Sequence, residues 1–448
     1  MNTGALDDLW LDQMPRDWKS SRIRNVATLS PNYSQTPPAS DELCTVVPME
    51  AISVDGLIEA TEQQPREEIS TGLPLFEKGD VLFAKITPCM ENGKGAFVRQ
   101  LPTRYAFGST EFHVLRAGNK VDGQFLYYAT FNPVYRAYAA ENMVGAAGQK
   151  RVSSRFLKDT RLFLPPLPEQ QRIAAYLDAS CASIDAAVAA KCQQLETLDA
   201  LRKSIIQRAV TRGISEGVKL ESTGNAWMAQ IPRGWKVVCL KRIAEIQGGL
   251  TLGKQYEGPL IERPYLRVGN VQDGHLDLAD VSLIELPASV AKGVELRPGD
   301  VLMTEGGDLD KLGRGYLWKG EIPGCLHQNH IFAVRCFLHK LKPMFLAYLT
   351  ASKYGRDYFE ATGKKTTNLA CTNATKVGEF PIPLPRLTEQ EAICAYLEGK
   401  LSEVKGIVSS IEYQIATLTA YRKSLIHECV TGQRRVTEAD INRVKTHG

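Results

Sequence analysis

The chain has 448 residues, of which 44% are hydrophobic and 23% are charged. This composition is ordinary for a folded protein and unlike that of a disordered chain. At roughly 150 residues per domain, the length predicts about three folding units and excludes one small domain. The net charge of +4 is too small to identify a partner. No uninterrupted apolar run approaches the roughly 18 residues that span a bilayer, so we expect a cytoplasmic protein without a membrane partner.

The sequence repeats itself. The stretch W-L-D-Q-M-P-R-D-W-K at 10–19 returns as W-M-A-Q-I-P-R-G-W-K at 227–236, and G-D-V-L at 79–82 returns at 299–302. The longest match aligns residues 169–211 with 389–431 without a gap, and about 17 of these 43 positions are identical. An internal repeat of this length is stronger evidence for the overall architecture than any single motif. We therefore predict a tandem duplication of one two-part unit.

Each copy begins with a mixed α/β segment, over 1–165 and 214–385. Short apolar runs such as V-L-F-A-K-I and I-F-A-V-R, bounded by Gly, Pro and Asn, are typical of strands and turns. One helix is expected within each segment, at F-L-Y-Y-A-T and at F-L-A-Y-L-T, where apolar residues cluster at helical spacing.

Each copy ends in a predicted long helix, over 166–213 and 386–432. Proline and glutamate at L-P-P-L-P-E-Q, and the related L-P-R-L-T-E-Q, are helix-start signals. Apolar residues then recur mostly at spacings of three, four or seven, which predicts a coiled-coil seam. A helix of 43 residues is about 65 Å long, so its expected partner is the other copy. We predict an antiparallel coiled coil with pseudo-two-fold symmetry, followed by a C-terminal tail over 433–448.

The repeated W-x-x-Q-x-P-x-x-W-K opening, the P-E-Q and T-E-Q helix entries, and the R-K-S-I-I-Q and R-K-S-L-I-H helix ends resemble the specificity subunit of type I restriction–modification enzymes. The resemblance covers essentially the whole chain. It implies that each mixed segment is a target-recognition domain, which reads one half of a bipartite, asymmetric site in double-stranded DNA. It also implies that the helices are spacers and that the chain is not an enzyme.

The resemblance further implies partners and cofactors. Two modification (methyltransferase) subunits are expected to bind this chain, and the sequence leaves open whether two restriction (translocase and nuclease) subunits join them. S-adenosylmethionine, ATP and Mg are expected on those partner subunits, with no cofactor in this chain. The repeated residues Arg202, Lys203, Arg422 and Lys423 near the helix ends are candidate partner contacts. A solvated helix face would give the same pattern.

The candidate DNA contacts lie in two matching loops. Residues 145–161 hold five basic residues and one acidic residue, and residues 363–373 are basic and rich in amides and hydroxyls. Lys and Arg neutralise phosphates, while Arg, Lys, Asn and Gln can pair with purine edges. We expect DNA contacts from Gln149, Lys150, Arg151, Ser153 and Arg155 in the first copy, from Lys364, Lys365, Thr366, Thr367 and Asn368 in the second, and from Arg136 and Arg356 just before these loops. A solvated loop, or a structural ion pair for the last two, remains the alternative.

Two other functions compete with this interpretation. A self-sufficient DNA methyltransferase or nuclease is the first, but the sequence lacks a cofactor loop, a P-loop and a paired-carboxylate nuclease signature. Asn132-Pro133-Val134-Tyr135 also lacks the second proline of the N-P-P-Y element. A structural coiled-coil scaffold leaves the α/β segments unexplained. His327 and His330 have the spacing of metal ligands, but no suitably placed cysteine accompanies them, so we expect no metal site.

Overall fold

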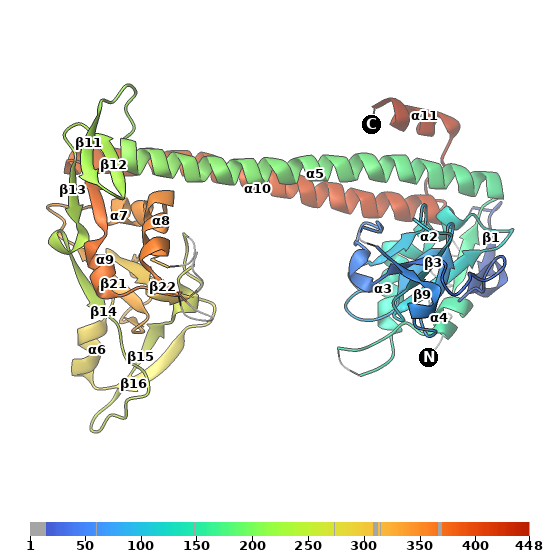
Figure 1. Cartoon of the computed structure of the whole chain (residues 1–448), viewed down its shortest axis with the longest axis horizontal. Coiled ribbons are helices and arrows are strands. Elements are labelled where there is room, and N and C mark those ends of the chain that lie inside the picture. Colours follow the sequence, from blue (N-terminus) through green and yellow to red (C-terminus); the bar gives the residue numbers. More distant parts are fainter. Residues whose placement is uncertain are drawn as a thin grey trace. The chain divides into compact units, whose positions relative to one another are not determined.

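The computed structural model describes residues 15–59, 61–146, 148–272, 274–307, 312–313, 315–365 and 370–447. The chain divides into two compact units (Figure 1). Unit 1 consists of residues 1–192 and 412–448, and unit 2 consists of residues 193–411. Two long helices each contribute to both units: α5 (Leu167–Arg212) and α10 (Leu387–Thr431).

The described part of unit 1 contains strands and short helices before α5. In chain order they are β1 (Lys19–Arg22), η1 (Ile23–Asn25), β2 (Ala27–Leu29), β3 (Leu43–Val47), η2 (Met49–Ala51), β4 (Glu62–Pro65), η3 (Arg66–Glu68), β5 (Leu75–Glu77), β6 (Val81–Ala84), β7 (Gly95–Phe97), β8 (Tyr105–Gly108), β9 (Phe112–Ala117), α2 (Gly123–Phe131), α3 (Pro133–Glu141), α4 (Ser154–Asp159) and β10 (Arg161–Leu164). After α10 comes α11 (Glu438–His447).

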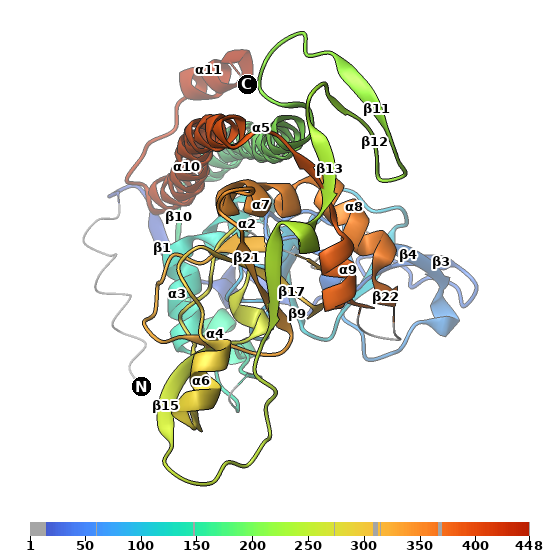
Figure 2. The ribbon, with the colours of Figure 1, turned by 90° about the vertical axis from the view of Figure 1, so that its left-hand side faces the viewer.

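Unit 2 begins with the hairpin of β11 (Leu220–Asn225) and β12 (Met228–Pro232), the light-green strands of Figure 2. The elements that follow are β13 (Lys236–Cys239), η4 (Leu240–Arg242), β14 (Ala244–Gly248), β15 (Ile261–Leu266), η5 (Val268–Asn270), β16 (Ser282–Leu286), α6 (Ala288–Val294), β17 (Asp300–Thr304), β18 (Gly306–Gly307), β19 (Gly315–Leu317), β20 (Leu326–His327), β21 (Ile331–Cys336), α7 (Pro343–Ala351), α8 (Lys353–Thr362), β22 (Lys364–Lys365), β23 (Ala370–Cys371), α9 (Ala374–Glu379) and β24 (Pro381–Leu384).

The two units share a sheet topology. Unit 1 has a four-stranded antiparallel sheet of order β2-β9-β6-β7, and unit 2 has one of order β14-β21-β17-β19. A small antiparallel pair, β1-β10 in unit 1 and β13-β24 in unit 2, leads in each case to the start of a long helix. Each unit is therefore a mixed α/β domain attached to long helices, as expected from the sequence.

Side-chain caps set the ends of the short helices in unit 1. The Asp122 carboxylate accepts hydrogen bonds from the backbone N–H groups of Gln124 (3.0 Å) and Phe125 (2.9 Å), so it caps α2. Asn132 caps α3 in the same way through the N–H of Val134 (3.0 Å), and Pro133 occupies the first helical position. The N-P-V-Y sequence is thus a helix start in this fold.

A buried glutamine joins each domain to the first turn of its long helix. In unit 1, Gln170 accepts from the N–H of Asp122 (2.8 Å) and donates to the carbonyls of Lys120 (3.2 Å) and Pro165 (2.9 Å). In unit 2, Gln390 accepts from Lys342 N–H (2.8 Å) and donates to the carbonyls of Lys340 and Pro385 (both 3.0 Å). The same three bonds hold each helix start against its own domain.

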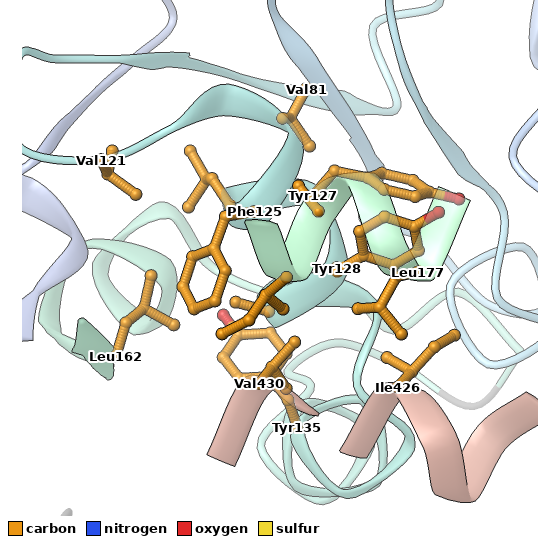
Figure 3. Close-up of a cluster of buried hydrophobic side chains, with 14 of the residues drawn as sticks. Val81, Val121, Phe125, Tyr127, Tyr128, Tyr135, Leu162, Leu177, Ile426 and Val430 are labelled. Carbon is orange, nitrogen blue, oxygen red and sulfur yellow. The ribbon is translucent and has the colours of Figure 1, made fainter. Parts of the chain in front are cut away.

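The core of unit 1 combines α2 with both long helices (Figure 3). Phe125 and Tyr128 of α2 are buried together with Leu177 of α5 and with Ile426 and Val430 of α10. In unit 2, Ile206 and Val210 of α5 share a core with Ile393 and Leu397 of α10. The burial of these residues stabilises the attachment of each domain to a pair of helix segments.

The segment after α10 differs from the tail that the sequence predicts. Val436 and Ile441 are buried in the core of unit 1, and Arg435 pairs with Asp17 (2.7 Å) and Glu169 (3.2 Å). The sequence prediction missed this because α11 is short and mostly polar. Its apolar residues acquire a role only where unit 1 offers them a surface.

Of the helices described, α5 alone is long and apolar enough, by length and composition, to cross a membrane. Its alanine-rich stretch raises the average hydropathy without forming the uninterrupted apolar run that the sequence analysis sought. Within unit 1, however, Ile173, Leu177 and Ile184 of this helix are buried against protein. A helix that packs into a protein core meets the same criterion.

Candidate nucleic-acid interface

In unit 1, three chain segments that are distant in sequence pair at one end of the sheet. Arg151 forms isolated β-bridges with Ile86 on one side and Val144 on the other. The N–H of Val152 also donates to the carbonyl of Lys85 (2.8 Å). We call residues 85–87, 144–145 and 149–152 the ribbon of unit 1. It places the basic loop predicted from the sequence beside the loop that joins β6 to β7.

Backbone bonds hold the ribbon of unit 1 in a tight loop. The N–H of Lys150 donates to Thr87 Oγ1 (3.0 Å), and the N–H of Thr87 donates to the Lys150 carbonyl (3.0 Å). Gly145 has φ of +134°, and a Cβ there would lie 2.7 Å from the carbonyl oxygen of Gln149, so only glycine suits the position. The side chains of Gln149 and Lys150 are exposed and are free to meet a ligand on this surface.

Arg151 is held by a carboxylate that the sequence analysis did not identify. Glu111 Oε1 accepts from Arg151 Nη2 (2.8 Å), and Glu111 Oε2 accepts from Arg151 Nε (3.0 Å). These hydrogen bonds lower the pKa of Glu111 and raise the pKa of Arg151. Both groups therefore stay charged at neutral pH, and the guanidinium plane is fixed.

Ser153 and Arg155 lie on α4, just beyond the ribbon of unit 1. The Ser153 hydroxyl accepts from the N–H of Phe156 (3.1 Å) and caps α4, which is a structural role. Arg155 is 92% exposed, and its Nε lies 3.7 Å from Asp159. Of these two predicted contacts, Arg155 is thus the more available to a ligand.

Unit 2 builds the same arrangement as a small sheet of order β18-β23-β22. Gly306 and Lys364 both pair with Cys371, so residues 305–307, 364–365 and 370–372 form the ribbon of unit 2. Lys364 is exposed. The backbone of Lys365 lies in β22, whereas the predicted contacts Thr366, Thr367 and Asn368 fall outside the described residues.

The two ribbons match in backbone and differ in side chains. The N–H of Lys85 donates to the carbonyl of Glu111 (2.9 Å), and the N–H of Glu305 donates to the carbonyl of His330 (2.8 Å). By these matched bonds, Lys85 corresponds to Glu305 and Glu111 to His330. In unit 2, His330 Nδ1 lies 2.9 Å from Glu305 Oε2, while Cys371 takes the place of Arg151. One scaffold thus presents different polar groups at the same place.

Arg136 is a correction to the predicted contacts. It is only 8% exposed, and its guanidinium donates to the carbonyls of Thr130 (3.1 Å), Met90 (3.2 Å) and Lys94 (3.3 Å). The burial of the guanidinium lowers the pKa of Arg136 to about 10. This side chain holds the fold together, and its burial argues against the predicted DNA contact. Its counterpart Arg356 is half-buried on α8.

The four candidate partner contacts lie on the long helices. Arg202 and Lys203 pair with Asp199 within α5, at 3.2 Å and 2.6 Å. Arg422 and Lys423 of α10 line a cavity of about 640 Å³ in unit 1, together with Ile184 and Val188 of α5. Arg422 Nε lies 3.0 Å from Asp185 of α5, without the angle of a hydrogen bond.

The sequence analysis missed Glu111, Lys85 and Glu305 because their partners lie far along the chain. A signal for the second loop was present in the repeated G-K-G at 93–95 and G-R-G at 313–315. Those glycines mark the hairpins that carry Lys85 and Glu305. Among the described residues, no cluster of three or more His, Cys, Asp or Glu side chains could hold a metal ion.

Comparisons with known proteins agree with this geometry. Residues 15–197 match the type I restriction modification DNA specificity domain. The chain is 32% identical over 166 residues to the EcoEI specificity subunit of Escherichia coli, covering 36% of this chain and 27% of that protein. It is 22% identical over 435 residues to the MjaVIII specificity subunit of Methanocaldococcus jannaschii, covering 95% of this chain and 94% of that protein.

The fold also has a solved counterpart. A chain from a structural study of complex assembly and conformational transition of the type I restriction–modification system superposes with a TM-score of 0.72, at 20% identity, covering 93% of this chain and 98% of that one. The fold and the match over residues 15–197 define a protein that contains a type I restriction modification DNA specificity domain. Over nearly its whole length the chain is similar to type I restriction–modification specificity subunits. The match to the EcoEI protein spans about a quarter of that relative.

Proposed function

We propose that this chain is the sequence-recognition subunit of a type I restriction–modification complex, in which units 1 and 2 each read one half of a bipartite, asymmetric DNA site. One observation carries the proposal: two domains of the same topology present different side chains on equivalent ribbons. Equal scaffolds with unlike surfaces are what a reader of two unlike sequences requires. Base edges specify a sequence, and phosphate contacts position the protein.

In this proposal the chain is a tandem duplication, and α5 and α10 form an antiparallel coiled coil that separates the two readers. Contacts within unit 1 support the antiparallel direction. Asp185 pairs with Arg422 of α10, whereas Tyr176, earlier in α5, lies under Arg434 (5.4 Å), which follows α10. A helix of 46 residues is about 69 Å long. A duplex presents the same face roughly every 34–36 Å, so helix length sets the spacing of the half-sites.

The proposed partners are double-stranded DNA, two methyltransferase subunits and, in a complete enzyme, two restriction subunits. The duplicated helices offer nearly the same surface twice, as two-fold oligomers do, which supports two copies of one partner. Chemistry and its cofactors, S-adenosylmethionine, ATP and Mg, then belong to those subunits. The chain itself is proposed to be non-catalytic and cytoplasmic.

The purified chain tests the proposal. It is expected to bind duplexes that carry one bipartite sequence, to lose about tenfold or more in affinity between roughly 50 and 200 mM salt, and to transfer no methyl groups alone. Inserting about one helical turn of residues into both α5 and α10 is expected to change the preferred spacing between the half-sites.

Two results would contradict the proposal. Methyl transfer by the isolated chain would favour a self-sufficient methyltransferase. Binding that is indifferent to both salt and sequence would favour a structural scaffold.

A further inference from the structure

The ribbon of unit 1 holds one guanidinium in a geometry that suits a specific base. Glu111 accepts from Nε and Nη2 of Arg151, and the carbonyl of Gln149 accepts from Nη1 (3.2 Å). A guanidinium has five N–H donors. Three of them are used here, so two remain, one on each Nη atom. The Arg151 side chain is 41% exposed, so these two donors are accessible from solvent.

The two remaining N–H donors, one on each Nη atom, match one base edge in particular. Guanine presents two acceptors, O6 and N7, in the major groove, and a bidentate pair with arginine is the commonest specific contact to DNA. We propose that Arg151 reads a guanine in the half-site of unit 1 and that Glu111 is the positioning residue that fixes its guanidinium. This inference rests on the proposed function, since it names the base that one ribbon recognises.

The ion pair argues for base reading over a phosphate contact. A phosphate attracts net charge and needs no fixed plane. Here the Glu111 carboxylate lies 2.8 Å from Nη2 of Arg151 and offsets its charge. The same contact fixes the orientation of the remaining N–H groups of Arg151. The neighbouring Lys150 is exposed, and no carboxylate pairs with its ammonium among the described contacts. It is therefore the better phosphate ligand of the two.

The ribbon of unit 2 cannot make the same contact. Cys371 stands where unit 1 has Arg151, and His330 stands where unit 1 has Glu111. The imidazole of His330 is held by Glu305 through Nδ1 (2.9 Å) and its side chain is 51% exposed, so it offers a single ring nitrogen and no guanidinium. Among the described residues of the ribbon of unit 2, this arginine contact therefore has no counterpart.

The test is selection of bound sequences from a library of randomised DNA duplexes by the full chain and by its Arg151→Lys variant. Lysine keeps the charge and loses the bidentate geometry. We expect the preference for guanine over other bases at one position to fall roughly tenfold to a hundredfold. The other half-site and the salt dependence should not change. Arg24→Lys, on a side chain that is 48% exposed and pairs with Asp159, is the matched control and should leave both half-sites unchanged.

Glu111→Gln tests positioning separately. It leaves Arg151 in place with an uncompensated charge, so the guanine preference should weaken at the same position while the salt dependence becomes steeper. If Glu111 had a purely structural role, Glu111→Gln would not both weaken the guanine preference at that one position and steepen the salt dependence of binding. Hydrogen exchange of peptides from β6 and β9 at the rate of the unaltered chain shows that unit 1 of each variant is folded.

The outcomes separate the two claims. If Arg151→Lys weakens binding to all sequences equally, Arg151 contacts phosphate and this inference is wrong, although the proposed function stands. If the unaltered chain selects no sequence in either half, the proposed function itself is wrong. If Arg151→Lys instead weakens the base preference in the half-site of unit 2, the assignment of Arg151 to a guanine in the half-site of unit 1 is also wrong.

Discussion

Units 1 and 2 keep the same polar bonds in their interiors and differ where side chains reach solvent. A buried ion pair crosses each four-stranded sheet: Arg116 with Asp80 (2.6 Å) and Arg335 with Asp300 (2.8 Å), with each aspartate side chain 1% exposed. The ribbons, in contrast, exchange Arg151 for Cys371. The comparison teaches that the interior bonds preserve the scaffold while the ribbon is free to change what it contacts.

The largest expected effect comes from breaking the shared interior pair. Asp80→Asn removes the closer of the two carboxylates beside the Arg116 guanidinium and leaves Glu77 at 3.4 Å. Removing one partner of a buried pair costs about 3 kcal/mol. Hydrogen exchange of peptides from β6 and β9 should quicken while β17 and β21 stay protected. Asp300→Asn should show the converse. Equal loss of protection in both units would mean that they do not unfold independently.

A smaller effect on stability is expected to distinguish Trp18 from its counterpart Trp235, near the start of each copy. Trp235 Nε1 donates to Glu389 (3.0 Å), whereas Trp18 Nε1 is buried without a partner and the matching Glu169 pairs with Arg435. Tryptophan to phenylalanine removes the same ring volume at each position. Trp235→Phe should therefore destabilise unit 2 by about 1–2 kcal/mol more than Trp18→Phe destabilises unit 1.

Unit-specific hydrogen exchange measures this tryptophan difference. Equal losses in the two units would indicate that the bond to Glu389 contributes no net stability.

The smallest effect is a dependence on pH that both units share. Burial lowers the pKa of His113 in unit 1, near Lys85 and Glu111, and lowers the pKa of His327 in unit 2, near Asp300 and Arg335. The unfolded chain takes up protons near pH 6.5 while the folded chain does not. Stability is thus complete above pH 6.5 and falls below it, by up to about 1.4 kcal/mol per pH unit for each histidine.

Unfolding of the full chain measured between roughly pH 7.5 and 5.5 checks this dependence. His113→Gln should reduce the slope in unit 1 alone. A slope that stays the same in this variant would place the titration elsewhere.

Local sequence signals predicted α2, α7 and the two long helices, but the expectation of one helix in each mixed segment was wrong, since α3, α4, α6, α8 and α9 also form. The clusters F-L-Y-Y-A-T and F-L-A-Y-L-T lie in α2 and α7, and the P-E-Q and T-E-Q entries open α5 and α10. These features depend on neighbours a few residues away, so spacing and capping chemistry suffice to find them.

The candidate site was harder to predict because its partners are distant in sequence. Arg136 looked available until three carbonyls, two of them more than 40 residues away, surrounded its guanidinium. Glu111 could not be linked to Arg151 without the ribbon that brings them together. Ser153 could have been recognised as a helix cap from its position before α4, because a serine hydroxyl there accepts a hydrogen bond from the first turn of the helix.

The return of the chain to unit 1 constrains how the protein is made. Val436 and Ile441 complete a core that begins with Trp18 and Ile23, so a growing polypeptide must pass through all of unit 2 before unit 1 can close. On the ribosome, unit 2 can finish folding while unit 1 still waits for α11. A nascent chain that stalls after α10 would thus carry one finished reader and one with apolar surface exposed to chaperones and proteases.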